Sequence, residues 1–401
     1  MGVLAVGAAV LLGLLLSSAH DGGAGTSRQG AQRAPRSRLP ACTRTLSAGA
    51  RLARALSRAA PNAVLCLRGG RYRGARIPAG ATDHAGWVTL QAAPGETPVF
   101  AGELAFDDAR HLRLRGLTFE AGLRFSPAAS HVQVIDNELT GVGGIFLFGD
   151  PREGGSVSSI LIRGNFIHDI DYSGSQDVYR GYGIKSIGSQ QGITVRGNTI
   201  KSVAADYLQT DEANGWTVDR NTFLGPSLVA GHRQEHQDLW QVYAGGRNLR
   251  FTNNVVRGTG TSQSLLFQLS YPSNRFADVV VANNLFERDS GGYSCQIYQS
   301  AGLRFRDNTI VGSRFGCLFR HDRRFPDGSG YQVDHNLFVG TVAGDDVGLE
   351  SGVRAWGAFD HNVSSDRSAS GAGSVRRWKP DWTGEIEYRP VGLPFAAGYR
   401  P

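Results

Sequence analysis

The sequence predicts an all-β fold, a single-stranded right-handed parallel β-helix (a solenoid of about ten coils) with a short N-terminal helical cap. Three observations lead to this prediction. A short phrase with a central Asn returns nine times, the copies are spaced by roughly 20 to 35 residues, and their apolar residues alternate as in strands. Each copy is too short to bury its own apolar face, so stacked copies have to form the core. The central residues are Asn137, Asn165, Asn198, Asn221, Asn254, Asn284, Asn308, Asn336 and Asn362.

Each phrase is expected to form a strand, a turn and a second strand. Val, Ile, Phe and Thr fill the apolar positions, and these residues favour strands. Asn tolerates left-handed backbone angles and suits a sharp bend, and equivalent Asn side chains on successive coils can stack as a ladder. No amphipathic helical stretch lies in residues 87–363, which argues against helical repeats. An antiparallel sandwich or a propeller is the alternative, although propeller blades have longer and more uniform periods.

The first residues have the composition of an export signal. Residues 3–16 are almost wholly apolar and are followed by small residues, which predicts a secretory signal cut near Ala19. No Lys or Arg precedes this run, so an uncleaved signal anchor remains open. The expected segments are a signal peptide at 1–19, a disordered basic linker at 20–40, an N-terminal cap and first strand at 41–80, the β-helix at 81–371, and an aromatic-rich C-terminal cap or tail at 372–401.

The four cysteines predict two structural disulfides. Cys42 and Cys66 bracket a helical pattern at residues 46–59, where a disulfide would fix the cap. Cys295 and Cys317 occupy equivalent positions on consecutive coils, and strand spacing suits the Cα separation of a disulfide. Metal binding by the cysteines is not expected, because the chain has no Cys-x-x-Cys spacing. Paired structural cysteines are typical of an oxidising compartment, so the protein is expected to be secreted.

The net charge bears on the partner. The formal charge is +7, and nearly all cations are Arg, with Lys only at Lys185, Lys201 and Lys379. A basic exported solenoid could bind an anionic polymer, although a codon bias towards Arg would give the same composition. We expect an acidic polysaccharide as the partner, no nucleic acid, no stable membrane insertion after signal cleavage, and a monomer.

A strand that follows each phrase carries the candidate binding residues. Its second residue is always apolar and must point inward, so the third residue points outward. This outward column suits the hydroxyls and carboxylates of an extended polysaccharide, but stacked Gln side chains could equally be a structural ladder. The inward column is Ile184, Leu208, Trp240, Phe267, Ile297 and Phe319, and the outward column is Lys185, Gln209, Gln241, Gln268, Tyr298 and Arg320.

The densest polar cluster lies at residues 231–241, which include Arg233, Glu235 and His236. Asp206 and Asp238 are expected in one column, one coil apart. Two carboxylates so placed share a proton, raise each other's pKa or hold a cation. Ca²⁺ is the expected cation for oxygen ligands, with Asp206, Asp238 and Glu235 as ligands. Alternatively, the two Asp side chains cap backbone N–H groups of turns.

These residues also match the requirements of β-elimination on a uronate. The reaction needs a base for the C5 proton, a partner that neutralises the carboxylate, and an acid for the leaving oxygen. Lys can serve as a base when it is desolvated, whereas Arg cannot. The candidates are Lys185 or His236 as the base, Arg320, Arg233 or a bound cation for the carboxylate, and Tyr243 or Tyr298 as the acid, with Gln209, Gln241, Gln268, Tyr298 and Arg233 as substrate-binding residues.

Over residues 42 to about 371 the chain resembles the pectate-lyase-like superfamily of right-handed parallel β-helix proteins. The resemblance rests on the Asn phrases, on Cys66-Leu-Arg-Gly-Gly-Arg-Tyr after the cap, and on His236-Gln-Asp-Leu-Trp-Gln. The last stretch is similar to one in secreted bacterial proteins related to polysaccharide lyases and uronate epimerases. The resemblance implies a lyase that cleaves an acidic, uronate-containing glycan. The catalytic sets of alginate epimerases, polygalacturonases and pectate lyases are missing, so a non-catalytic glycan-binding protein and a hydrolase that uses Asp pairs remain alternatives.

Overall fold

The computed structural model describes residues 40–149, 155–171, 180–225, 237–271, 273–341, 345–365, 374–375 and 398. The expected signal peptide and nearly all of the linker and the C-terminal tail lie outside these residues. None of the helices in the described part of the chain is both long and apolar enough to span a bilayer.

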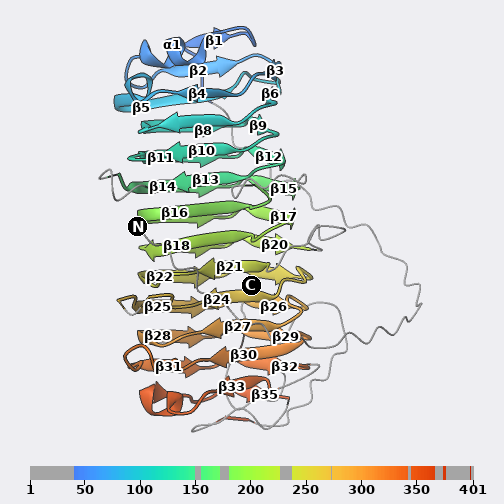
Figure 1. Cartoon of the computed structure of the whole chain (residues 1–401). Helices are drawn as coiled ribbons and strands as arrows, with labels where there is room; N and C mark the ends of the chain where they lie inside the picture. The colour runs from blue at the N-terminus through green and yellow to red at the C-terminus, as the bar shows by residue number, and fades with distance from the viewer. Residues whose placement is uncertain are drawn as a thin grey trace, which may run out of the picture. The chain divides into compact units, whose positions relative to one another are not determined.

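The described residues form a right-handed parallel β-helix (Figure 1). Every ladder pairs a strand with its equivalent one coil away in parallel, which excludes the antiparallel sandwich and the propeller. The strands form one sheet of 23 and one of 12 members. The smaller sheet has one strand per coil, so the described residues span twelve coils where about ten were expected.

The smaller sheet runs the length of the solenoid. It consists of β3 (Gly70–Tyr72), β6 (Pro98–Phe100), β9 (Thr118–Phe119), β12 (Glu138–Gly141), β15 (Phe166–Ile170), β17 (Thr199–Val203), β20 (Thr222–Leu224), β23 (Val255–Arg257), β26 (Leu285–Glu287), β29 (Thr309–Val311), β32 (Leu337–Val339) and β35 (Val363–Ser364).

The larger sheet contains two ladders that β16 and β18 join, because these long strands pair in both. One ladder consists of β4 (Ala75–Ile77), β7 (Leu104–Asp107), β10 (Leu123–Ser126), β13 (Ile145–Phe148), β16 (Ile184–Arg196), β18 (Leu208–Asn214), β21 (Asp238–Val242), β24 (Gln263–Phe267), β27 (Tyr293–Ile297), β30 (Phe315–Phe319) and β33 (Val347–Leu349). The other adds β1 (Arg44–Leu46), β2 (Val64–Leu67), β5 (Asp83–Ala92), β8 (Arg110–Arg115), β11 (Ser130–Ile135), β14 (Val157–Arg163), β19 (Thr217–Asp219), β22 (Gly246–Thr252), β25 (Phe276–Ala282), β28 (Ser300–Arg306), β31 (Tyr331–Asp334) and β34 (Gly357–Ala358).

Helices are confined to the two ends of the described stack. The cap helix α1 (Leu52–Ser57) is shorter than the helical pattern at 46–59, and it buries Leu52 and Leu56. Two short 3₁₀ helices follow, η1 (Ala79–Ala81) and η2 (Val353–Trp356). The ladders already begin within the expected cap, because β2 pairs with β5 and β3 pairs with β6.

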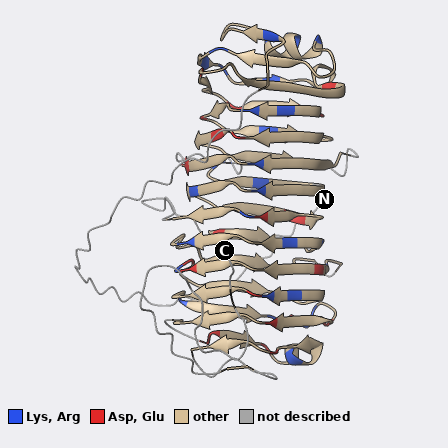
Figure 2. Cartoon of the chain, turned by 180° about the vertical axis from the view of Figure 1, so that it is seen from behind, with Lys and Arg blue, Asp and Glu red and all other residues tan. Residues whose placement is uncertain are grey.

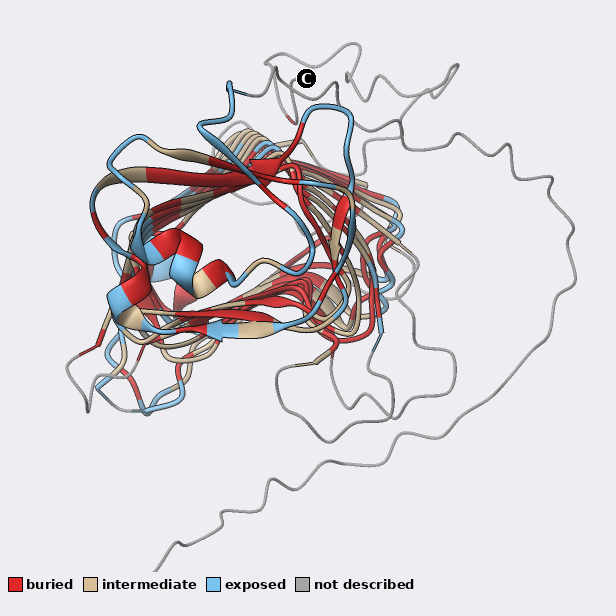
Figure 3. Ribbon diagram, turned by 90° about the horizontal axis from the view of Figure 1, so that it is seen from above, coloured by how far each residue is buried: buried red, intermediate tan, exposed pale blue. Residues whose placement is uncertain are grey.

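The core is a continuous apolar column inside the coils, visible as buried segments in the view from above (Figure 3). Aromatic rings from successive coils stack in it; the rings of Phe106 and Phe125, for example, have centroids 5.5 Å apart. All six residues of the predicted inward column are buried, which confirms which strand face points inward. Burial of a side chain of this size stabilises the fold by about 1.5–3 kcal/mol.

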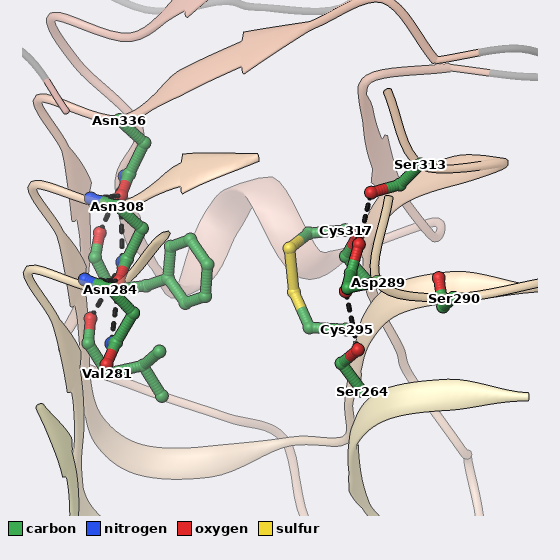
Figure 4. The surroundings of a disulfide bond; sticks show 12 residues. Ser264, Val281, Asn284, Asp289, Ser290, Cys295, Asn308, Ser313, Cys317 and Asn336 are labelled. Carbon is green, nitrogen blue, oxygen red and sulfur yellow. Dashed lines mark hydrogen bonds between the residues drawn. A yellow bond between two sulfur atoms is a disulfide. The ribbon is translucent and has the colours of Figure 1, made fainter. Parts of the chain in front are cut away.

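The nine repeated asparagines form a continuous, buried ladder, part of which is drawn in Figure 4. In a typical step, the Oδ1 of Asn254 accepts both the main-chain N–H of Asn221, at 2.9 Å, and its Nδ2, at 3.1 Å. The Nδ2 of Asn221 also donates to the carbonyl oxygen of Val195 at 2.9 Å. Each Asn side chain therefore provides hydrogen-bond partners for buried backbone and side-chain groups of two coils, which explains why the residue recurs.

The sharp bend is made by the residue before each ladder Asn. This residue has a left-handed φ in all nine copies, 56° at Asp136 and 57° at Asn253, for example. The expectation that the repeated Asn itself takes this conformation is therefore wrong. Its side chain has to point along the stack, and the preceding Asp, Asn, His, Arg or Gly absorbs the turn.

Both expected disulfides are present. Cys42 and Cys66 have Cα atoms 5.6 Å apart and tie the chain before β1 to β2. Cys295 and Cys317 are paired residues on β27 and β30, with Cα atoms 4.5 Å apart, and their disulfide lies inside the coils (Figure 4). The second bond therefore crosslinks two consecutive coils.

Candidate functional site

Three residues of the predicted outward column lie side by side on consecutive coils. Lys185 of β16 pairs with Gln209 of β18, which pairs with Gln241 of β21. The side chains face outward, yet only 8%, 6% and 5% of these residues is exposed. Polar groups that are this strongly desolvated interact more strongly than groups on an open surface. We call Lys185, Gln209, Gln241, Asp206 and Tyr243 the central site.

The outward column is wrong beyond Gln241. Trp240 pairs with Leu265 instead of Phe267, so Leu266 is the neighbour of Gln241. The pairing of β21 with β24 is shifted by two residues from the predicted register, and a shift of two leaves each side chain on the same face of the strand. The inward and outward faces were therefore predicted correctly, although the neighbours along the column were not. The main-chain N–H groups of Gln268, Tyr298 and Arg320 donate to Val242, Phe267 and Ile297, respectively, which places these three residues in line with Tyr243.

Arg320 is distant from the central site. It lies five coils from Lys185, roughly 24 Å at the usual strand spacing. Its guanidinium forms an ion pair with Glu350 at 3.0 Å and lies over the ring of Tyr298. Arg320 and Lys185 therefore cannot act on the same bond of a substrate, and the sequence-based grouping of the two residues is wrong. Arg233, Glu235 and His236 lie outside the described residues.

Gln209 is the centre of the hydrogen-bond network. Its Nε2 lies 2.7 Å from Oδ2 of Asp206, 3.1 Å from Oε1 of Gln241 and 3.3 Å from the hydroxyl oxygen of Tyr243. The contact between the two Gln side chains agrees with the ladder alternative. The ladder stops there, because the next residue in the column is Leu266.

Asp206 and Asp238 occupy equivalent positions on adjacent coils, as predicted. Oδ1 of Asp206 accepts the main-chain N–H of Asp238 at 2.7 Å, and Oδ1 of Asp238 accepts that of Gln263 at 3.0 Å. Both carboxylates thus accept backbone N–H groups, as in the capping alternative.

The described residues fit a Ca²⁺ site poorly. Both oxygens of Asp206 already accept hydrogen bonds from protein groups. In the described part of the chain, no group of three or more His, Cys, Asp or Glu side chains is arranged to hold a metal ion. Ca²⁺ binding through Asp206, Asp238 and Glu235 stays a prediction.

Two titratable groups next to this network are shifted towards their neutral forms. Burial, followed by the charges of Asp206, Asp238 and Asp211, raises the pKa of Tyr243 to about 12. Burial also raises the pKa of Asp211, although the Gly188 N–H and the charge of Lys185 act in the opposite direction. Tyr243 is therefore a protonated phenol at neutral pH and can only donate a proton there.

Lys185 adjoins a small hollow on the outer face. Its Nζ lies 3.9 Å from the centre of the Tyr182 ring, a cation–π contact. A cavity of about 80 Å³ is lined by Lys185, Arg124, Phe146, Phe148, Ile187 and Leu147. Arg124 pairs with Glu103 at 2.7 Å.

Sequence reasoning missed Arg124 and Phe146, which precede Lys185 in the same outward column. The predicted outward column begins with Lys185 on β16. Arg124-Phe125-Ser126, two coils earlier, shows the same alternation of polar and apolar residues, so the sequence contains a signal for Arg124.

Comparison with known proteins identifies the fold. The sequence profile described as "Right handed beta helix region" matches residues 121–338, more than half of the chain. A family 6 polysaccharide lyase from Pseudopedobacter saltans has a TM-score of 0.50 and 13% identity, over 89% of this chain and 90% of that one. A pectate lyase has a TM-score of 0.48 and 12% identity, over 84% and 97%. A search of curated proteins finds no match.

A family 6 alginate lyase has a TM-score of 0.48 and 13% identity. The matched part covers 80% of this chain and 51% of the alginate lyase, so the chain spans about half the length of that enzyme. At 13% identity, the similarity to the Pseudopedobacter saltans lyase shows a common fold.

Proposed function

Because the chain belongs to the family of right-handed β-helix proteins, we propose that its central site is the active site of a polysaccharide lyase. The substrate would be an acidic, uronate-containing glycan, cleaved by β-elimination. The observation that carries the proposal is the pairing of a desolvated Lys185 with Gln209, whose amide contacts a phenol that stays protonated. This combination provides a candidate base and a candidate acid on one face of the solenoid.

In the proposed reaction Lys185 first gives its own proton to water and then removes the C5 proton of the uronate ring. The electron pair of the C–H bond forms the C4–C5 double bond, and the bond from C4 to the glycosidic oxygen breaks. Tyr243 gives its proton to that oxygen, which leaves as a hydroxyl group. His236 is the alternative base and lies outside the described residues.

The uronate carboxylate needs a cation, since its neutralisation acidifies the C5 proton. Arg124 lines the same cavity as Lys185 and lies two coils from it, against five coils for Arg320, which supports Arg124 as the carboxylate partner. The uronate carboxylate would then replace Glu103, the present ion-pair partner of Arg124. Arg binds carboxylates through two parallel N–H donors.

Gln268 follows Tyr243 one coil further along the stack, so it could contact a sugar next to the cleaved bond. Tyr298 and Arg320 lie two and three coils from Tyr243, where they could contact only remote sugars of a long chain.

The experiment offers alginate, polygalacturonate and glycosaminoglycans to the protein and records the ultraviolet absorbance of an unsaturated product. We expect product from at least one polymer, and a loss of about 100-fold or more in kcat for Lys185→Met. Lys201→Met, on the other sheet, is the matched control and should keep full activity. No unsaturated product from any uronate polymer, or full activity of Lys185→Met, would overturn the proposal.

A non-catalytic glycan-binding protein is the second candidate. The observation in its favour is that Gln209 and Asp206 bond to each other and to neighbouring coils, as structural residues do. Binding of a uronate polymer without any product would select it. Reducing ends without unsaturation would instead indicate a hydrolase.

We further propose that the protein is exported and acts outside the cell on an acidic polysaccharide as a monomer. The two disulfides support this location, because such bonds persist in oxidising compartments. Expression of the full chain, followed by recovery of a shortened, disulfide-bonded protein from the medium, tests both the location and the signal cleavage.

A further inference from the structure

The positive charge of the chain is concentrated at its N-terminal end. Residues 40–82 contain eight Arg and no Asp, Glu or Lys, whereas residues 83–401 contain 30 Lys and Arg against 34 Asp and Glu. The sequence after residue 82 is thus slightly acidic, although the whole chain has a formal charge of +7. A uniform codon bias towards Arg does not remove acidic residues from one segment. The eight residues are Arg44, Arg51, Arg54, Arg58, Arg68, Arg71, Arg73 and Arg76.

All eight arginines are exposed, on or beside β1, α1, β2, β3 and β4. Figure 2 shows these elements with blue segments at one end of the stack. Arg71 pairs with Glu120 at 2.6 Å and Arg76 with Asp107 at 2.7 Å. Within the described residues, the other six form no ion pair with a carboxylate. We call the surface formed by these eight residues the arginine cap.

Two hollows flank α1 on this surface. One, of about 360 Å³, is lined by Arg44, Arg51, Arg54 and Arg58 together with apolar residues. The other, of about 680 Å³, is lined by Arg51, Arg71, Arg73 and Arg76 together with small and larger apolar residues, Tyr72 among them. Arg51 lines both hollows, so the two hollows adjoin each other at the helix. The Cys42–Cys66 disulfide ties this segment to the first coils.

We propose that the arginine cap is a second binding surface for an acidic polysaccharide, separate from the central site. Guanidinium groups match carboxylate and sulfate geometry and stay charged at any physiological pH. Their spread over two hollows suits a polymer with repeated charges better than a single small anion. β4 lies four coils from Lys185, roughly 19 Å, so the two surfaces contact different parts of a polymer.

The composition of the cap favours a polysaccharide over single-stranded nucleic acid. Surfaces that bind single strands stack bases on exposed aromatic rings. Residues 40–82 have one aromatic residue, Tyr72, which is buried with its hydroxyl bonded to the carbonyl of Arg68. The proposal does not depend on catalysis at the central site. If that site is catalytic, binding at both surfaces would raise the apparent affinity for long polymers.

The test measures the binding of the full protein to immobilised polygalacturonate at low and moderate salt. The cap variant replaces Arg44, Arg51, Arg54 and Arg58 by Gln. The matched control replaces four other exposed arginines, Arg247, Arg250, Arg304 and Arg323, by Gln, with the same change in net charge. We expect the dissociation constant of the cap variant to rise about 10- to 30-fold, since each exposed charge pair contributes modestly, and that of the control by less than about threefold. The difference should shrink as salt is added.

Equal weakening in both variants would overturn the proposal, because it would indicate general charge attraction. Unchanged binding of the cap variant to polygalacturonate would also overturn the proposal. A third contrary result is that the wild type prefers double-stranded DNA to polygalacturonate and the cap variant loses this preference. Thermal melting shows whether each fourfold variant folds. If a fourfold variant does not fold, single substitutions such as Arg54→Gln are measured in its place. Product formation from short oligouronates reports on the central site alone, so failure of either proposal can be recognised separately.

Discussion

The side-chain amide of Gln209 donates a 2.7 Å hydrogen bond to Oδ2 of Asp206, three residues earlier in the same coil. The other oxygen of this carboxylate accepts the main-chain N–H of Asp238 in the next coil, also at 2.7 Å. Asp206 is almost completely buried, so these two bonds replace its contacts with water. The Asp206 carboxylate therefore connects the side chain of Gln209 to the backbone of β21, the strand that carries Gln241.

We predict that Asp206→Ala destabilises the protein by about 2–4 kcal/mol, because two buried donors lose their acceptor. Denaturant unfolding of the wild type and the variant measures the difference. A matched replacement of an exposed carboxylate, Asp83→Ala, should change stability by less than about 1 kcal/mol.

The same pair of proteins tests the Ca²⁺ prediction. If Asp206 only bonds to protein groups, the difference in stability between the wild type and Asp206→Ala is the same with Ca²⁺ and with a chelator. If Asp206 is a Ca²⁺ ligand, Ca²⁺ raises the melting temperature of the wild type and leaves that of Asp206→Ala unchanged.

The Asn ladder gives a second stability prediction. Asn254→Ala removes the acceptor for two donors of Asn221 and the donor to the carbonyl oxygen of Val218. We expect a loss of about 2–4 kcal/mol in the free energy of unfolding. Asn214→Ala, which removes only an exposed bond to Glu212, should cost less than about 1 kcal/mol. Similar losses in both variants would contradict the structural role of the ladder.

Much of the fold could be predicted from the sequence, because the ladder imposes the same local pattern on every coil. The recurring Asn predicted the parallel solenoid, and the equivalent positions of Cys295 and Cys317 predicted their disulfide. The alternation of apolar residues predicted which side chains point inward. These features depend on side-chain period and spacing, which a sequence contains directly.

The outward column could be predicted only in part. Lys185, Gln209 and Gln241 are indeed neighbours, but Gln268 and Arg320 belong to the neighbouring column. The length of the connection between β21 and β24 decides which residues of the two strands pair. A shift of this pairing by two residues leaves the apolar pattern unchanged, so the pattern could not show it. Arg124 was missed because its coil precedes the first strand that was aligned.

Asp289 provides a prediction on pH dependence. It is fully buried, and burial raises its pKa, although hydrogen bonds from Ser264, Ser313 and Ser294 act in the opposite direction. The folded state thus holds this proton to higher pH than the unfolded chain does. The stabilisation is complete below the ordinary carboxyl pKa of 3.8 and is lost as pH rises towards the folded value.

We therefore expect Asp289→Asn, which carries no titrating proton, to gain stability relative to the wild type as the pH rises above the ordinary carboxyl pKa of 3.8. Denaturant unfolding at several pH values measures this change. The exposed Asp278→Asn is the control for the loss of a surface carboxylate. A gain in the control equal to that in Asp289→Asn would contradict the assignment.

The role proposed for Tyr243 can be separated from a structural one. Its pKa of about 12 keeps the phenol protonated at neutral pH, so it can give a proton to the leaving oxygen. We predict that Tyr243→Phe lowers kcat by about 100-fold or more with little change in KM. Tyr271→Phe, at a residue that is 65% exposed, should keep full activity. A uronide whose leaving group is a stable phenolate needs no proton, so it should restore the turnover of Tyr243→Phe to near the wild-type rate. If Tyr243 only orients Gln209, both substrates would be slowed equally.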